Sequence, residues 1–236
     1  MDYKNLVFLG TSHIARQSLN EVAEYIEREK PGIIAIELDR ARLNALLSKE
    51  PRKVNIGIIR KIGLKGFIFS LLGAWAEKKL GKIVGVSPGS EMKQAVKLAK
   101  KYNIKIALID QDIKITLNRF SKSITWREKW NFFADIIKAF FVRDKELQFD
   151  LRTVPEKKII KKLVEKLKGR YPNVYKTLIE ERNIVLANNI KRLMEAEPDK
   201  KILIIIGAGH VDDVIKMIKN NEDIINYTFS THNINQ

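Results

Sequence analysis

Apolar runs and amphipathic segments alternate at the amino-terminal end of the chain. NLVFLGT (residues 5–11) and PGIIAIELD (residues 31–39) are short apolar stretches bounded by turn-forming or polar residues, which is typical of buried strands. The segments that follow them, HIARQSLNEVAEYIEREK and RARLNALLSK, repeat apolar residues at helical spacing. This strand–helix–strand–helix order predicts a parallel sheet with right-handed crossovers.

The same alternation returns in the second half of the chain. Buried strands are expected in IKIALID (residues 104–110) and KILIIIGAGH (residues 201–210), and a last strand is expected within INYTFST (residues 225–231). We therefore expect an α/β fold whose mostly parallel central sheet is built from both ends of the chain. Residues 1–236 are expected to form one domain.

The spacing of apolar residues in the middle of the chain predicts mainly helices. TWREKWNFFADIIKAFFV (residues 125–142) predicts an amphipathic helix rich in aromatic residues, and a Lys-rich helix is expected near residues 156–169. A long helix is then expected from about Pro172 to Ala196. We expect residues 51–170 to contain a basic, largely helical insert, packed beside the sheet or as a cap over one edge of it.

Positive charge is concentrated in this middle region. The net charge is −3 over residues 1–39, +20 over residues 40–170 and −1 over residues 171–236. A basic region of this kind suits an anionic membrane surface, nucleic acid or an acidic substrate. The alternative is an ordinary Lys-rich solvated surface. No nucleic-acid recognition motif accompanies the charge, so nucleic acid ranks last among these partners.

The absence of cysteine narrows the chemistry that the chain can support. Disulfides and thiolate metal sites are excluded, so a bound metal must use His, Asp, Glu or backbone oxygen. The apolar stretch GFIFSLLGAWA (residues 66–76) is well short of the roughly 20 residues that span a bilayer. No signal peptide is visible, so we expect a cytoplasmic protein. The alternatives are a protein peripheral to the membrane and the soluble portion of a longer membrane protein.

Two of the three histidines stand in matching settings. His13 in LVFLGTSH and His210 in LIIIGAGH each follow an apolar run, a glycine and two small residues. Because the carboxyl ends of parallel strands meet at one edge of a sheet, where ligands bind, we expect both side chains to project into the same crevice. Glu37, at the end of IAIELD, is expected at the same edge.

Two histidines and one carboxylate form an ordinary divalent-metal triad. The set His13, Glu37 and His210 would suit Mn, Zn or Co and leave positions for water and substrate. Glu37 could ligate the metal or act as the general base toward a bound water. The alternative is that each glycine–histidine stretch is a strand-to-helix turn that binds phosphate or has only a structural role.

Six blocks in order resemble the TraB family, which is named for a pheromone-shutdown protein and is related to the TIKI metalloproteases. The blocks are LGTSHIARQS, IAIELDRAR, SPGSEMKQA, LIDQDIKITLNR, EERN and IIIGAGHV. The resemblance implies a divalent-metal-dependent hydrolase-like site in which His13, Glu37 and His210 are essential. It also implies a set of supporting or substrate-binding residues: Arg42, Glu91, Asp110, Thr116, Arg119, Glu181 and Arg182.

These supporting residues have two interpretations. Arg119 or Arg182 could bind a substrate carboxylate or stabilise an oxyanion, but both, like Arg42, could instead form buried ion pairs that hold helices on the sheet. Asp110 could reach the crevice from the end of its strand. The chain departs from the family pattern at Gln111, where the family often has arginine, and at Asn183, where it has aspartate.

Three functions follow from these observations. The first is a metal-dependent peptidase or related hydrolase acting on peptides. The second is a module that sequesters a peptide or small ligand without cleaving it. The third is a peripheral membrane protein, because the aromatic and basic segments of the middle region resemble interfacial helices. Those apolar faces could instead pack on the sheet or on a second subunit, and a homodimer is the expectation we favour over membrane attachment.

Overall fold

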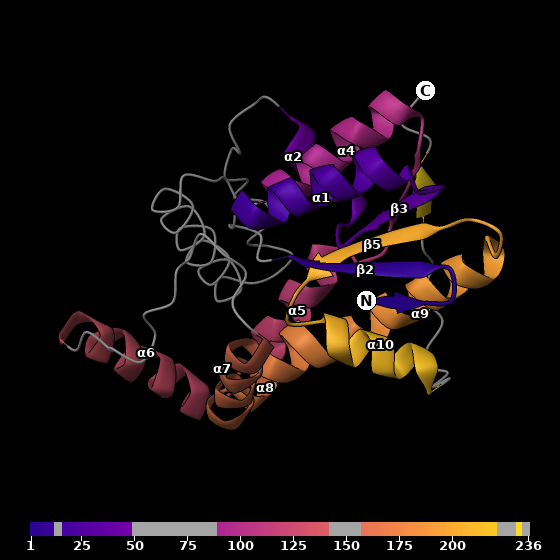
Figure 1. Cartoon of the computed structure of the whole chain (residues 1–236). Coiled ribbons are helices and arrows are strands. Elements are labelled where there is room, and N and C mark those ends of the chain that lie inside the picture. Colours follow the sequence, from indigo (N-terminus) through magenta and orange to yellow (C-terminus); the bar gives the residue numbers. More distant parts are fainter. Residues whose placement is uncertain (12–15, 49–88, 142–156, 221–229, 233–236) are drawn as a thin grey trace.

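The computed structural model of the chain places a six-stranded sheet at the centre of the molecule (Figure 1). It describes residues 1–11, 16–48, 89–141, 157–220 and 230–232. Two stretches of the predicted helical middle, 51–88 and 142–156, lie outside the described residues, as does His13. One domain with a largely helical insert within residues 51–170 therefore stays a prediction.

The sheet is assembled from both ends of the chain, as predicted. Its strand order is β1-β2-β5-β3-β4-β6, in which β2, β5, β3 and β4 pair in parallel and the two edge strands pair antiparallel. The amino-terminal β1 was not expected, because two residues are too few to show a hydrophobic period. The strands span β1 (Asp2–Tyr3), β2 (Leu6–Thr11), β3 (Ile33–Ile36), β4 (Lys105–Leu108), β5 (Ile202–Gly207) and β6 (Ser230–His232).

Helices cover both faces of this sheet. Figure 1 shows α1, α2 and α4 on one side and α9 and α10 on the other, whereas α6 extends away from the body of the molecule. The helices span α1 (Arg16–Glu29), α2 (Arg40–Leu47), α4 (Ser90–Tyr102), α5 (Ile113–Ser123), α6 (Trp126–Phe141), α7 (Lys157–Arg170), α8 (Pro172–Tyr175), α9 (Glu181–Ala196) and α10 (Val211–Lys219).

Each strand contributes to two hydrophobic layers because successive side chains point to opposite faces. Leu6 and Phe8 of β2 join a core with α9 and α10, whereas Val7 joins a core with α1, α2 and α4. All four residues of β3 and all six of β5 are buried. Burial on both faces explains why the parallel strands read as continuous apolar runs in the sequence.

The long helix predicted from Pro172 to Ala196 is continuous but not uniform. Between α8 and α9 the chain forms a π-helical turn, η2 (Lys176–Glu180), in which the amide of Glu181 donates to the carbonyl of Lys176. Turns of this type are frequent at functional sites. The next helix, α9, follows it directly, and its first three residues are Glu181, Arg182 and Asn183.

No helix in the described part of the chain is both long enough and apolar enough to cross a membrane.

Gly10 marks a close approach between the two ends of the chain. A Cβ atom at this position would lie 3.1 Å from Cγ2 of Val211 and 3.2 Å from Cα of Ala208. The second of these neighbours is backbone and cannot move without shifting the turn after β5. Because Gly10 has no Cβ atom, Ala208 and Val211 of the second motif can pack closely against the first motif.

We expect Gly10→Ala to lower the free energy of unfolding by about 1–3 kcal/mol, because the added methyl group overpacks this contact. Gly169→Ala is the matched control, since no heavy atom lies within 4 Å of a Cβ built there. Alanine at this helical position is expected to raise the free energy of unfolding by about 0.4–1 kcal/mol. Urea unfolding of both variants measures the difference; a neutral Gly10→Ala would contradict the close approach.

Candidate functional site

The strands that lead to the two glycine–histidine motifs lie side by side. β2 and β5 pair in register from Leu6 with Ile202 to Thr11 with Gly207, and the amide of Ala208 donates to the carbonyl of Thr11 at 2.8 Å. Both motifs therefore leave the sheet at the same level of its carboxyl edge. The structure describes His210 of the second motif; His13 of the first lies outside the described residues.

Glu37 is buried at the same edge, one residue beyond β3. Its amide donates to the carbonyl of Ile205 at 3.1 Å, which extends the pairing of β3 with β5. Its Oε2 accepts the amide of Gly207 at 2.5 Å, and its Oε1 accepts a hydrogen bond from Nη2 of Arg182. The carboxylate is thus held between the start of the second motif and a guanidinium group from α9.

His210 lies against Glu37 and is oriented by α9. Its Nε2 is 3.8 Å from Oε1 of Glu37, and its Nδ1 is 2.5 Å from Oδ1 of Asn183. The other end of the Asn183 amide, Nδ2, donates to Asp213 at 3.3 Å, so the oxygen is the atom that faces the imidazole. Because an amide oxygen only accepts, Nδ1 carries the proton, and in the neutral ring the lone pair lies on Nε2.

Arg182 joins two strand ends through their carboxylates. Besides Glu37, it donates to Oδ2 of Asp110, from Nη2 at 2.5 Å and from Nε at 3.2 Å. Burial alone would lower the pKa of Arg182, but the carboxylates of Asp110 and Glu37 raise it above its ordinary value. The guanidinium therefore stays charged, and its pairing with two carboxylates corresponds to the ion-pair interpretation, one of the two that the sequence left open for Arg182.

Arg42 continues the network to α2. Its Nη2 donates to Oδ2 of Asp110 at 2.6 Å and its Nε donates to Oδ2 of Asp39 at 2.6 Å. Burial would lower the pKa of Arg42, but Asp110 and Asp39 raise it. Asp39 also caps α2, since its Oδ1 accepts the amides of Ala41 and Arg42 at 2.8 and 3.0 Å. The cluster thus ties α2 and α9 to the ends of β3 and β4.

The remaining predicted residues lie around this cluster rather than within it. Arg119 of α5 pairs with Glu181 of α9 at 2.9 Å, and the arginine side chain is half exposed. Thr116 accepts a hydrogen bond from Nε2 of Gln111 at 2.8 Å. Glu91 is buried in the first turn of α4, where the helix dipole favours an acidic residue.

The structure thus brings together Glu37, Asp110, Arg42, Arg182 and His210 of the predicted set. Among the described residues no group of three His, Asp or Glu side chains is arranged to hold a metal, and the third proposed ligand, His13, is not among them.

The sequence motifs assign no role to two residues of the site. One is Asp39, although an aspartate directly before a helix is an N-cap signal. Asn183 was noted only as a departure from the family pattern. No local pattern predicts its bond to His210, which is 27 residues away.

We expect Asp39→Ala to lower the free energy of unfolding by about 2–4 kcal/mol, since it removes a helix cap and leaves Arg42 with one carboxylate fewer. Asp112→Ala is the matched control: Asp112 caps α5 through one bond, to the amide of Lys114, so about 1 kcal/mol is expected. Urea unfolding at pH 7 compares the two variants. Equal losses would show that the Asp39–Arg42 pair adds nothing beyond capping.

The contribution of Asp39 to the free energy of unfolding is expected to depend on pH. Burial would raise the pKa of Asp39, but its bonds from the backbone and side chain of Arg42 hold it below the ordinary value. A carboxyl group whose pKa is lower in the folded state than in the unfolded state stabilises the fold at pH values above the unfolded-state pKa. This stabilisation is lost as the pH falls through the folded-state pKa. The difference between wild type and Asp39→Ala should therefore shrink below about pH 4.

Comparison with known proteins places this arrangement in a family. The sequence profile of the TraB/PrgY/gumN family matches residues 2–223. An uncharacterised protein of Methanocaldococcus jannaschii is 37% identical over 225 residues, which cover 93% of this chain and 54% of the relative. TraB domain-containing proteins of Mus musculus and Homo sapiens are 23% and 22% identical over 239 residues, which cover 91% of this chain and 63% of each relative.

The chain therefore spans between about half and two thirds of the length of these curated relatives. The profile match begins before β2 and ends after α10, so it includes every strand that contributes to the site. The chain belongs to the TraB/PrgY/gumN family.

Proposed function

We propose that the strand-end cluster is a divalent-metal-dependent hydrolytic centre that acts on peptides, with His13, Glu37 and His210 as the metal-binding set. The observation that carries this proposal is the pairing of His210 with Glu37, whose Nε2 and Oε1 lie 3.8 Å apart. Both groups are buried at the carboxyl edge of the sheet, and β2, which leads to His13, ends beside them.

The described donors fit a metal ion in kind and in spacing. Two ligand atoms that each bind one Zn²⁺ at about 2.1 Å are roughly 3–3.5 Å apart, so the 3.8 Å separation requires only a small side-chain adjustment. A histidine that binds metal through one nitrogen usually donates the other N–H to an oriented acceptor. Asn183 is such an acceptor for His210.

The bound ion would supply an ionised water near neutral pH and polarise the scissile carbonyl. Arg182 and the amide of Gly207 would hold Glu37 in position, and Asn183 would hold the imidazole. Glu37 would act either as a ligand or as the base that takes the proton of the attacking water. Glu37→Gln separates the two roles, because loss of a base spares the metal content and loss of a ligand does not.

A second candidate function is capture of a peptide or small ligand without cleavage. Both central carboxylates are already engaged: Glu37 by Arg182 and Gly207, and Asp110 by Arg42 and Arg182. Such a network can hold a rigid binding surface without turning a substrate over. The exposed half of Arg119 could then contact a ligand carboxylate.

Elemental analysis of protein purified without chelator tests the metal site. We expect close to one Mn, Zn or Co per chain in the wild type, and loss of most of it in His13→Ala and in His210→Ala. His232→Ala is the control, because this third histidine lies in the edge strand β6 and not in either motif. Metal that is absent from the wild type, and not taken up when supplied, would refute the proposed centre.

Turnover is tested separately with the metal-loaded protein. We expect a mixture of short unstructured peptides to yield fragments that mass spectrometry detects, with Glu37→Gln inactive. Peptides that bind but are recovered intact after long incubation would favour capture over hydrolysis. Metal content and cleavage together therefore separate the two candidate functions.

We expect Asn183→Ala to weaken metal affinity by about 10- to 100-fold, because the imidazole of His210 loses the acceptor that orients it. Asn183→Asp keeps an acceptor for the Nδ1 proton and should retain the metal. Asn189→Ala is the control on the same helix: Asn189 is equally buried but donates to the carbonyl of Ile109. Titration of a competing fluorescent chelator measures the affinities; equal losses at both positions would indicate a general loss of structure.

A further inference from the structure

The helix α6 turns its polar face toward the rest of the molecule. Asn131 donates to the carbonyl of Arg170, and Asp135 accepts two hydrogen bonds from the Arg170 guanidinium, at 2.6 and 2.5 Å. One turn earlier, Glu128 is only 2% exposed and accepts the amides of Asn173 and Val174 at the start of α8. These three side chains lie on one face because they are three and four residues apart.

The pKa of Glu128 reflects this anchoring. Burial would raise it, but hydrogen bonds from Thr125 and Asn173 hold it below its ordinary value. The acid therefore stays charged at neutral pH, beside the amino-terminal end of α8. The hydrogen bonds of Glu128 to the start of α8 therefore determine which face of α6 turns toward the rest of the molecule.

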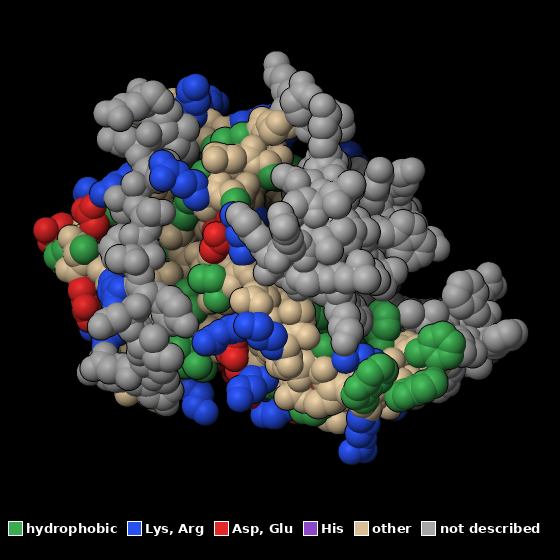
Figure 2. Space-filling view, turned by 180° about the vertical axis from the view of Figure 1, so that it is seen from behind, with side chains coloured by type: hydrophobic (Ala, Val, Ile, Leu, Met, Phe, Trp, Pro, Cys, Tyr) green, Lys and Arg blue, Asp and Glu red, His purple; other side chains and the backbone are tan. Residues whose placement is uncertain are grey.

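The opposite face of α6 is aromatic and exposed. Trp126, Trp130 and Phe133 follow one another at spacings of four and three residues and are 71%, 66% and 55% exposed. We call these three residues the aromatic stripe. The rings of Trp130 and Phe133 meet edge to face with centroids 6.1 Å apart. Figure 2 shows hydrophobic side chains gathered at the end of the molecule where α6 projects.

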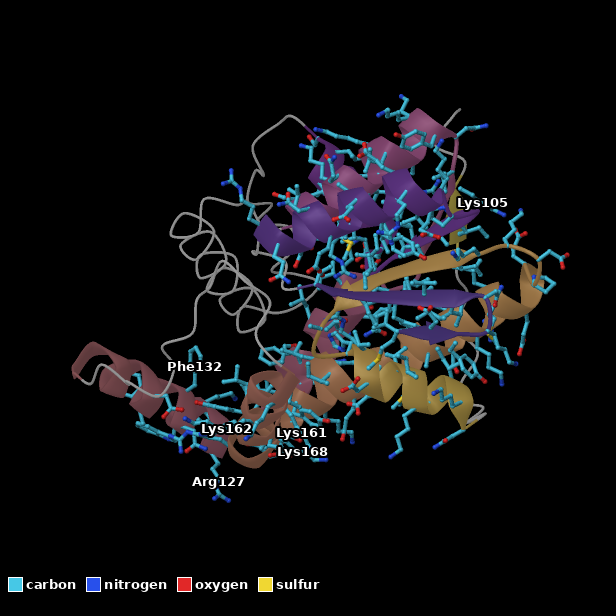
Figure 3. The ribbon with its side chains drawn as sticks, in the orientation of Figure 1. Lys105, Arg127, Phe132, Lys161, Lys162 and Lys168 are labelled. Carbon is cyan, nitrogen blue, oxygen red and sulfur yellow. The ribbon has the colours of Figure 1, made fainter. Side chains whose placement is uncertain are left out.

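Cations flank the aromatic stripe, whereas the acids of α6 turn inward. Arg127 is exposed beside the stripe, and Nζ of Lys129 lies 4.7 Å from the centroid of the Trp126 ring. In Figure 3, Arg127 reaches away from the body of the molecule, and the labelled Lys161, Lys162 and Lys168 belong to the neighbouring α7. The α7 sequence carries seven basic residues and one acidic residue.

We propose that the aromatic stripe and its flanking cations dock α6 on an anionic phospholipid surface. Tryptophan and phenylalanine side chains insert at the boundary between headgroups and acyl chains, and Arg and Lys side chains extend from there to the lipid phosphates. The charge of α7 adds long-range attraction to such a surface. The charges on this side of the molecule are therefore complementary to an anionic partner.

A second copy of the chain fits this surface less well. The stripe runs about 10 Å along the helix, whereas a stable protein interface removes about 800 Å² from each partner. A symmetric contact would also bring Arg127 and Lys129 near their own copies, and the inward-facing acids could not compensate them. Nucleic acid is left as an outcome of the test, because the cations of α6 and α7 would attract it as well.

Vesicle flotation with the full chain tests the proposal. We expect binding to phosphatidylcholine vesicles that contain 30% phosphatidylglycerol, at least about tenfold weaker binding to phosphatidylcholine alone, and weakening when NaCl is raised from about 0.1 to 0.5 M. The variant Trp126→Ala/Trp130→Ala should lose about tenfold or more in affinity. Both tryptophans are exposed, so circular dichroism should show an intact fold.

Two matched controls distinguish binding through the aromatic stripe from nonspecific electrostatic attraction and nonspecific hydrophobic adsorption. Arg127→Gln/Lys129→Gln should weaken binding more than Lys100→Gln/Lys101→Gln, which removes the same charge from exposed positions on α4, across the sheet from α9 and α10 (Figure 1). Leu47→Ala, at an apolar position 41% exposed on α2, should leave binding unchanged. The proposal is independent of the metal centre, so metal content should be the same in all these variants.

Four outcomes of the binding experiments would overturn the proposal. The first is absence of binding to the anionic vesicles, and the second is unchanged binding by the tryptophan double variant. The third is self-association, measured by analytical ultracentrifugation, that this variant abolishes, which would assign the stripe to a second copy. The fourth is tight binding to single-stranded DNA that the same variant abolishes.

Tryptophan emission gives an independent readout. In a Trp75→Phe background only Trp126 and Trp130 emit. Their emission should be that of exposed indole in buffer and should shift to the blue on anionic vesicles. A blue emission in buffer alone would show that another part of the chain covers the stripe, and the proposal would fail.

Discussion

The buried guanidinium of Arg182 connects the elements that meet at the candidate site. It bridges carboxylates that follow two different strands, Glu37 after β3 and Asp110 after β4, and it holds α9 against both. Buried charges are tolerated only where they are paired and hydrogen-bonded, so removal of any member leaves the others uncompensated. Through Asp110 and Arg42 the same constraint extends to Asp39 and to the start of α2. The position of Glu37 beside His210 therefore depends on an ion-pair network that spans three sequence-distant segments.

Much of the fold could be predicted from the sequence because its signals are local. The uninterrupted apolar runs of β2, β3, β4 and β5 show that these strands are buried on both faces, and the alternation with helices indicates parallel pairing. The strand-end positions of Glu37, Asp110 and His210 followed from that topology alone. β1 could not be predicted because two residues carry no period. The π turn before Arg182 leaves no signature in hydrophobicity.

The side-chain pairs of the site, unlike the strands, could not be predicted from local sequence patterns. Sequence separation between Glu37 and Arg182 is 145 residues, and no pattern along the chain indicates which carboxylate an arginine will meet. The resemblance to the family implies an aspartate at the position where this chain has Asn183. In the structure the amide oxygen still faces His210, while the amide nitrogen donates to Asp213, a bond that a second carboxylate could not make. The asparagine thus retains the orienting contact and avoids a repulsion between like charges.

The rotation of α6 shows how a polar contact can decide which face of an amphipathic helix is buried. Hydrophobic periodicity alone would turn Trp126, Trp130 and Phe133 inward. The carboxylate of Glu128 instead accepts two amides at the start of α8, where unsatisfied N–H groups and the helix dipole favour a negative charge. This interaction, together with the pair between Asp135 and Arg170, directs the aromatic side outward. Figure 1 places α6 on the same side of the molecule as the carboxyl edge of the sheet. The same two polar contacts that attach α6 to α7 and α8 therefore also determine which of its faces is available to a partner.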